Sequence, residues 1–277
     1  MANIKNVAII GAGQMGCGIA HVFALAGYRV LLNDINAAQL SAGLATIEKN
    51  LARQVASEKI TQSDSEAALA LISTHGELAA LAEADLVIEA ASEDENIKLQ
   101  ILEAVSALVS DDTLLASNTS SISITRLAAQ TRHPENFIGM HFMNPVPVMQ
   151  LVELIRGMAT SDESFETAQA IVQKLGKTAA MSEDYPAFIV NRILLPMINE
   201  AAFALYEGVG SVASIDEAMQ LGANHRMGPL QLADFIGLDT CVSIMRVLQD
   251  GLGDDKYRPC PLLVKYVEAG WLGRKSG

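Results

Sequence analysis

The chain has 277 residues, half of them hydrophobic, which is long enough for one large domain or two unequal ones with a substantial core. Its 19 Lys and Arg against 32 Asp and Glu give a formal net charge of −13, which disfavours binding to nucleic acid or to an anionic membrane. Three scattered cysteines, an N-terminus without a basic region and cleavage site, and the lack of a membrane-length apolar run predict a reduced, cytoplasmic protein.

The first part of the chain alternates extended apolar runs with helical patterns, which is typical of βαβ units on a mainly parallel sheet. Helices are expected at 14–26, 36–56, 64–72, 94–109 and 123–131. Three capping boxes are predicted from their spacing, each at the start of a helix. They are Ser92-x-x-Glu95 and, further along the chain, Thr160-x-x-Glu163 and Ser214-x-x-Glu217. Strands are expected in NVAIIGAG, YRVLLND, ADLVIEAAS, DTLLASNTS, FIGMHF and QLVELIRG.

After about residue 184 the strand-like runs disappear. Residues 187–209 predict a helix that is apolar on most of its circumference, so it should be buried on several sides, and Pro196 should kink it. The segment SEDYPA (182–187) resembles a joint between domains. We therefore expect an α/β protein: a Rossmann-like, doubly wound sheet in residues 1–184, followed by an all-helical domain in residues 185–277.

The run VAIIGAGQMGCGIA predicts a dinucleotide site, because its glycines follow a strand and precede a helix. Gly residues at these positions allow a tight turn, close approach of a pyrophosphate, and close packing of helix on strand. Asp34 ends the next strand, 18 residues after the last of them, where an acid binds the ribose and repels the 2′-phosphate of NADP. The alternative is a tight turn that binds nothing. The residues expected to contact NAD here are Gly11, Gly13, Gln14, Met15, Gly16 and Asp34.

Polar side chains mark three further strand ends, at Ser92, Ser117 and His141. The ends of such strands surround the ligand crevice of an open α/β sheet. The run SNTSSISI (117–124) places several hydroxyl and amide side chains there. Helix capping alone is the competing explanation for this run, since Ser, Thr and Asn are preferred caps.

His141 stands alone in an apolar run, and the other histidines are too scattered to complete a zinc site, so no metal is expected. A histidine satisfied in the core is one explanation. The other is a catalytic pair: Asn-Pro-Val-Pro can turn the chain so that Glu153 meets the imidazole. Glu153 lies between Val152 and Leu154, where an unpaired charge would be costly. Beside NAD, such a pair could act as the base that takes a hydroxyl proton while hydride leaves the same carbon.

These blocks together resemble the short-chain L-3-hydroxyacyl-CoA dehydrogenase family, most closely its bacterial 3-hydroxybutyryl-CoA members. The resemblance follows the order and spacing of GAGQMGCGIA, SNTSS, GMHFMNPVPVMQLVE, FIVNRILLPMINEA and LGANHRMGPLQLADFIGLD over nearly the whole chain. It implies reversible NAD-linked oxidation of a (3S)-3-hydroxyacyl-CoA, short-chain, in fatty-acid or butanoate metabolism. It also implies a helical domain that closes the substrate cleft and forms a homodimer.

The resemblance assigns roles residue by residue. His141 matches the catalytic base, Glu153 its partner, Ser120 the serine that binds the reacting oxygen, and Asn191 an asparagine from the helical domain. Positions that contact NAD in the family are matched by Glu93, Lys98, Asn118, Ser120 and Lys275.

Other interpretations stay open at this point. Glu93 and Lys98 also fit the solvated first turn of a helix. Segment 47–60 corresponds to a hairpin that contacts CoA in the family, and Lys49, Arg53 and Lys59 are either its phosphate ligands or a solvated helix face. The competing functions are a related dehydrogenase of free β-hydroxyacids, which generally uses a lysine base, and a non-catalytic NAD-binding protein.

Overall fold

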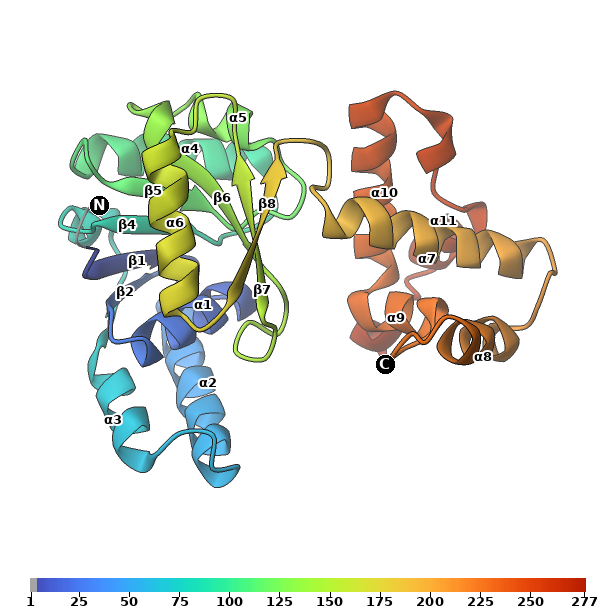
Figure 1. Ribbon diagram of the computed structural model, residues 1–277, viewed down its shortest axis with the longest axis horizontal. Helices are drawn as coiled ribbons and strands as arrows, with labels where there is room; N and C mark the ends of the chain where they lie inside the picture. The colour runs from blue at the N-terminus through green and yellow to red at the C-terminus, as the bar shows by residue number, and fades with distance from the viewer. Residues whose placement is uncertain (1–3) are drawn as a thin grey trace. The chain divides into compact units, whose positions relative to one another are not determined.

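The computed structural model of the chain describes residues 4–277 (Figure 1). The chain divides into two compact units, Met1–Tyr185 and Pro186–Gly277. All eight strands belong to the first unit, and the second is helical. The predicted fold class, a mainly parallel α/β sheet followed by a helical domain, is confirmed.

The first unit is built on one sheet with the strand order β3-β2-β1-β4-β5-β6-β7-β8. The order reverses between β1 and β4, because the chain fills one half of the sheet before crossing to the other. From β3 to β6 all neighbouring strands run parallel; β7 is antiparallel to β6, and β8 is parallel to β7. The strands are β1 (Asn6–Ile10), β2 (Arg29–Asn33), β3 (Ile72–His75), β4 (Leu86–Glu89), β5 (Leu114–Ser117), β6 (Phe137–Phe142), β7 (Leu151–Arg156) and β8 (Thr178–Glu183).

Helices cover the sheet and complete the second unit. In Figure 1, α6 lies over β6, β7 and β8, while α2 and α3 form a hairpin that packs against α1. The first unit contains α1 (Gln14–Leu25), α2 (Ala37–Ala56), α3 (Gln62–Ala70), α4 (Glu95–Leu108), α5 (Ile124–Ala128) and α6 (Asp162–Lys174). The second contains α7 (Val190–Tyr206), α8 (Val212–Gly222), α9 (Pro229–Ile236), α10 (Leu238–Leu252) and α11 (Pro261–Glu268). None of the helices in the described residues combines the length and apolar composition needed to cross a bilayer.

The structure contains two edge strands that were not predicted, and three helices are capped by residues other than the predicted ones. Both β3 (ISTH) and β8 (TAAMSE) are partly exposed and lack the continuous apolar run of a central strand. The three expected capping boxes are wrong, because other side chains cap those helices: Asp94 for α4, Ser161 for α6 and Ser211 for α8. A capping box exists elsewhere, between Thr61 and Asp64 at the start of α3.

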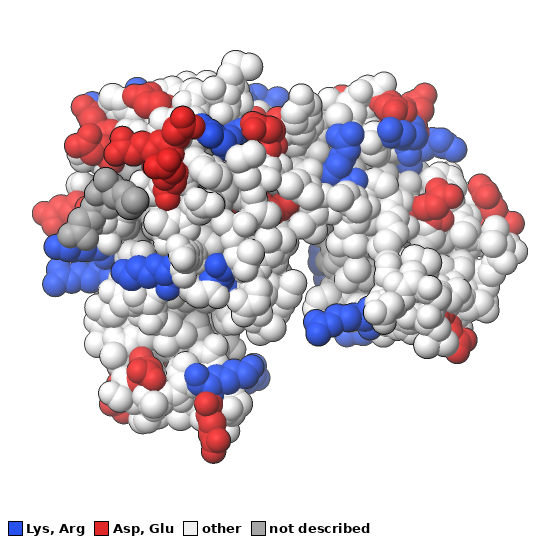
Figure 2. Space-filling view, in the orientation of Figure 1, with Lys and Arg blue, Asp and Glu red and all other residues white. Residues whose placement is uncertain are grey.

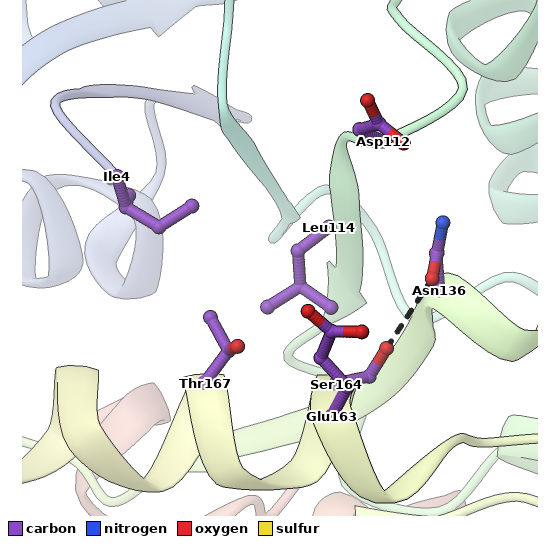
Figure 3. Close-up of a pocket in the computed structure, with 7 residues that line it drawn as sticks. All are labelled: Ile4, Asp112, Leu114, Asn136, Glu163, Ser164 and Thr167. Atoms are coloured by element: carbon purple, nitrogen blue, oxygen red, sulfur yellow. Dashed lines mark hydrogen bonds between the residues drawn. The ribbon is translucent and has the colours of Figure 1, made fainter. Parts of the chain in front are cut away.

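A pocket of about 370 Å³ lies at the amino ends of the parallel strands, opposite the end of the sheet that carries the predicted nucleotide loop (Figure 3). Figure 3 shows side chains from the start of β5 and from the first turns of α6 pointing into it. Ser164 donates a hydrogen bond to the carbonyl oxygen of Glu135 at this edge, at 2.8 Å. Ligands of open α/β sheets bind at the carboxyl ends of the strands, so this pocket is not the candidate site. It is lined by Ile4, Asp112, Leu114, Asn136, Glu163, Ser164 and Thr167.

Candidate active site

The glycine loop after β1 has the geometry of a pyrophosphate cradle. Gly11 has φ +105°, and a Cβ there would lie 2.6 Å from the Ala90 carbonyl oxygen. A Cβ on Gly16 would lie 1.8 Å from the Gly11 carbonyl oxygen, so this glycine lets helix and strand pack closely. A Cβ on Gly13 would meet nothing within 4 Å. Open space therefore faces the backbone at the position where the second glycine admits a phosphate.

The start of α1 completes this cradle. Gln14 is the first residue of the helix and is exposed, Met15 is half-buried, and neither a side-chain cap nor an acidic residue occupies the first turn. The N–H groups and the positive end of the helix dipole are thus available to an anion. These residues fit the diphosphate of a dinucleotide.

Asp34 follows β2 and lies beside the glycine loop. Its carboxylate accepts hydrogen bonds from the Ala12 amide and the Asn36 amide, at 2.8 and 2.9 Å. These bonds fix the side chain at the carboxyl end of the sheet on the β2 side of β1. A fixed carboxylate there fits ribose hydroxyls and disfavours a 2′-phosphate.

His141 and Glu153 face each other across the β6–β7 hairpin, in direct register. The imidazole Nδ1 and the carboxylate Oε2 are 2.8 Å apart, His141 is 7% exposed and Glu153 is fully buried. An ionised carboxylate only accepts, so Nδ1 carries the proton and Nε2 is the ring atom able to take one. The predicted return of the chain after Asn-Pro-Val-Pro is confirmed.

Lys177, which precedes the first residue of β8, holds the turn of this hairpin. Its Nζ donates to the carbonyl oxygens of Val146 and Met149, at 2.7 and 2.6 Å. Partial burial lowers the pKa of Lys177. The turn also packs on α1, since a Cβ on Gly18 would lie 2.9 Å from Val146 Cβ. Sequence reasoning did not find Lys177, because nothing local links it to a turn 28 residues earlier.

The turn that follows β5 is held by Glu93. A single carboxylate oxygen, Oε1, accepts from Thr119 Oγ1 at 2.6 Å, from the Ser120 amide at 2.9 Å and Ser120 Oγ at 3.1 Å, and from Ser121 Oγ at 3.2 Å. An oxygen has two lone pairs, so four donors share them and the longer bonds are weak.

Glu93 is ionised in this arrangement. Burial would raise the pKa of its carboxyl group, but the positive charge of Lys98 and the hydrogen bonds from Thr119 and Ser120 outweigh burial and lower it. The side chain is still 41% exposed, so it can also reach a ligand.

Capping explains part of the SNTSSISI run. Ser123 caps α5, and Thr119 Oγ1 accepts from the amides of Ser121 and Ile122. Asn118 has a different role, because its Oδ1 accepts from the Phe142 amide at 2.9 Å and so ties the ends of β5 and β6 together.

Lys98 is almost fully buried, at 1% exposure, so the alternative of a solvated helix turn is wrong for this residue. Its Nζ lies 2.8 Å from both carboxylate oxygens of Glu89 and 3.5 Å from Glu93 Oε2. Glu89 ends β4 and was missed. The sequence could have indicated Glu89, because a carboxylate that directly follows the apolar residues Leu86–Ile88 needs a partner, as Glu153 does among its apolar neighbours.

Two predicted residues belong to the helical unit. Asn191 is the second residue of α7 and is half-buried. Lys275 donates to Asp239 Oδ1 at 2.9 Å and to Thr240 Oγ1 at 2.8 Å, at the start of α10. Burial would raise the pKa of Asp239, but the bonds and charge of Lys275 lower it. The contacts of Asn191 and Lys275 with substrate and NAD stay predictions.

No group of three His, Cys, Asp or Glu side chains in residues 4–277 is arranged to hold a metal ion. The first unit thus gathers four features at the carboxyl ends of its strands: the glycine loop, Asp34, the Glu93-bound turn and the buried His141–Glu153 pair. A dinucleotide can lie across them, with the imidazole of His141 at one end.

Both units of the chain are similar to known proteins. A family model described as 3-hydroxyacyl-CoA dehydrogenase, NAD binding domain, matches residues 6–185, and its C-terminal domain counterpart matches residues 188–277. A 3-hydroxybutyryl-CoA dehydrogenase of Bradyrhizobium diazoefficiens is 64% identical over 99% of this chain and 94% of its own length. A probable 3-hydroxybutyryl-CoA dehydrogenase of Bacillus subtilis is 53% identical, over 99% and 96%. The crystal structure of (S)-3-hydroxybutyryl-CoA dehydrogenase from Ralstonia eutropha superposes with a TM-score of 0.97 at 49% identity, covering 99% of this chain and 97% of the other.

Proposed function

Because the chain belongs to the 3-hydroxyacyl-CoA dehydrogenase family, we propose that it oxidises a (3S)-3-hydroxyacyl-CoA reversibly with NAD, using His141 as the base. It is an NAD-dependent oxidoreductase of this family. The observation that carries the proposed roles is the buried 2.8 Å pair between His141 and Glu153 at the carboxyl end of the sheet.

The pair is suited to moving one proton. NAD held by the glycine loop and Asp34 would supply the acceptor for the hydride of the carbon that bears the hydroxyl group. His141 takes the hydroxyl proton on Nε2, because Nδ1 already donates to Glu153. The imidazole becomes positively charged in this step, and the adjacent carboxylate stabilises that charge. In the reverse direction the same imidazolium returns the proton to the carbonyl oxygen.

Ser120 is the residue we assign to the reacting oxygen. Its hydroxyl lies in the turn that follows β5 and shares Glu93 Oε1 with three other donors, and it matches the serine that binds the reacting oxygen in the family. Asn191 is assigned to the substrate because it matches the family's asparagine from the helical domain. Both roles are proposals.

The substrate we propose is a short-chain acyl-CoA, in keeping with the names of the relatives. A CoA phosphate needs local positive charge in a protein with net charge −13. Lys49, Arg53 and Lys59 are exposed on the α2–α3 hairpin and could supply it. Figure 2 shows basic and acidic side chains together at the end of this hairpin, which leaves the solvated-face alternative open.

We propose that the enzyme is a cytoplasmic homodimer. Large apolar side chains of the helical unit are exposed, among them Tyr206 (58%), Val209 (77%), Leu221 (79%) and Trp271 (63%). A second copy of the chain would cover such a surface. Light scattering on the purified protein should give twice the 29.5 kDa of one chain, and a mass of one chain would contradict the proposal.

The experiment that tests the reaction is loss of NADH absorbance with acetoacetyl-CoA, with free acetoacetate and NADPH as comparisons. We expect turnover that requires the CoA ester and prefers NADH. His141→Gln should fold and bind NADH but lose most turnover. Turnover of free acetoacetate would favour a β-hydroxyacid dehydrogenase, and tight NADH binding without turnover by the native chain would favour a non-catalytic NAD-binding protein.

A further inference from the structure

The end of β4 carries a buried ion pair whose carboxylate, Glu89, has no role in the reaction as described so far. Glu89 is fully buried and Lys98 is 1% exposed, and both oxygens of the carboxylate lie 2.8 Å from the ammonium group. Ser117 Oγ donates to Glu89 Oε2 at 2.6 Å, and the Ala91 amide donates to Oε1 at 2.7 Å. The carboxylate of Glu89 is therefore held by two uncharged donors as well as by a cation.

Stability is a weak explanation for this pair. Removing two charges from water costs much of what their attraction returns, and packed apolar residues of the same size often do as well. A pair maintained at this cost, at the edge of the sheet where ligands bind, suggests a role for the charges themselves.

The position of the pair relative to the cofactor follows from the topology. The pyrophosphate site lies at the Gly13 turn after β1, and Asp34 places the adenosine ribose on the β2 side. A dinucleotide crosses the sheet where the strand order reverses, which here is between β1 and β4. The nicotinamide half therefore lies over the ends of β4, β5 and β6, on the side of Glu89.

Lys98 links two carboxylates at this edge. It lies nearer to Glu89, at 2.8 Å, than to Glu93, at 3.5 Å. Glu93 thus turns one oxygen to Lys98 and keeps the other on the turn that contains Ser120. Two carboxylates and one ammonium group leave one net negative charge beside the nicotinamide half, whose ring is positive in NAD⁺ and neutral in NADH.

We propose that Glu89 is a positioning residue that acts through Lys98 on the cofactor. By taking most of the ammonium group's charge, Glu89 lets Glu93 stay on the Ser120 turn. The three groups together keep one negative charge that favours the oxidised cofactor over the reduced one. This proposal rests on the proposed function only in requiring that NAD is the cofactor.

The test is the ratio of the dissociation constants of NAD⁺ and NADH, measured by calorimetry without substrate. Glu89→Gln keeps the size and removes one negative charge, and its amide oxygen can still accept from the Ala91 amide and from Lys98. The ratio Kd(NAD⁺)/Kd(NADH) should then rise by about threefold or more. The double variant Glu89→Gln with Lys98→Met restores one net negative charge, and its ratio should return to within about twofold of the native value. The matched control is Glu163→Gln, which removes a carboxylate at the opposite edge of the sheet and should leave the ratio unchanged.

A ratio that stays constant while both dissociation constants rise together would show that Glu89 is only structural, and would overturn the proposal. If Glu89→Gln does not fold, Lys98→Met is compared with the double variant, since these two differ only in the charge at Glu89. The ratio should be lower in Lys98→Met, and equal ratios would again overturn the proposal. Because no substrate is present, the result is independent of turnover, whose absence in the native chain would instead refute the proposed function.

Discussion

Replacing Glu153 by Gln tests the proposed base most directly. The amide of Gln has nearly the shape of the carboxylate, so Val152 and Leu154 keep their packing. The amide nitrogen can donate to Nδ1 of His141, which would move the ring proton to Nε2 and leave that atom unable to take another. The substitution also removes the negative charge that balances the imidazolium formed during hydride transfer.

The size of the effect follows from the geometry. Nδ1 and Oε2 are 2.8 Å apart, with Glu153 fully buried and His141 7% exposed. For unit charges about 4 Å apart, at an effective dielectric constant of about 20, the attraction is about 4 kcal/mol, and it is no weaker at the shorter separation here. Each tenfold change in rate corresponds to about 1.4 kcal/mol. The turnover number should therefore fall by about 10³-fold, within the range typical of general-base catalysis.

The assay is kcat for oxidation of (3S)-3-hydroxybutyryl-CoA by NAD⁺, the direction in which His141 takes the proton, together with the dissociation constant of NADH and the free energy of unfolding in urea. We expect NADH affinity to stay within about twofold of the native value, because binding of the cofactor precedes formation of the charge. The matched control is Glu183→Gln, which changes an exposed carboxylate of β8 and should leave kcat unchanged. A kcat for Glu153→Gln within about fivefold of the native value would refute the role of the pair, since general-base help is worth far more.

Three further predictions follow from the first unit. Gly13→Ala should change the free energy of unfolding by no more than about 0.5 kcal/mol but weaken NADH binding about tenfold or more. Gly16→Ala should lower the free energy of unfolding by about 3 kcal/mol or more, because the Cβ at this position, unlike that at Gly13, would meet protein, at 1.8 Å. Urea unfolding measures the stability of each variant, and calorimetry measures its NADH affinity. Asp34→Asn should lower Kd(NADPH)/Kd(NADH) about tenfold in the same calorimetry, and an unchanged ratio would show that other groups select NAD. Burial lowers the pKa of His21 against the opposing Gln54 hydrogen bond, so below pH 6.5 the unfolded chain binds a proton that the folded chain does not. As the pH is lowered below 6.5, the free energy of unfolding should therefore decrease by up to about 1.4 kcal/mol per pH unit. His21→Asn should make this decrease smaller.

The hairpin that brings His141 and Glu153 together was predictable because two local signals agree. Both β6 and β7 read as apolar runs, and the Asn-Pro-Val-Pro turn between them returns the chain, so register alone brings Glu153 opposite His141. The glycine loop was predictable for the same reason, since its spacing and its position between strand and helix specify one geometry.

Features set by distant contacts were not predictable in this way. The edge strand β8 is identified only by its pairing with β7, and Lys177 only by the carbonyl groups it meets. The expected capping boxes had the right spacing, but Asp94 and Ser161 lie at the residues where the backbone leaves the extended conformation. Spacing restricts which side chains can cap a helix, whereas packing decides where the helix begins.

Glu89 could have been found by the argument that found Glu153. Each is a carboxylate at an apolar stretch of a central strand, and each is fully buried in the structure. A buried carboxylate needs a positive or hydrogen-bonding partner, and the two partners differ in kind: a fixed cation on Lys98 and an imidazole on His141 that is charged only when it holds a proton. The first carboxylate can therefore set a constant field at the cofactor, while the second acts only as charge develops. Two similar sequence signals thus point to two different tasks, and the identity of the partner is what separates them.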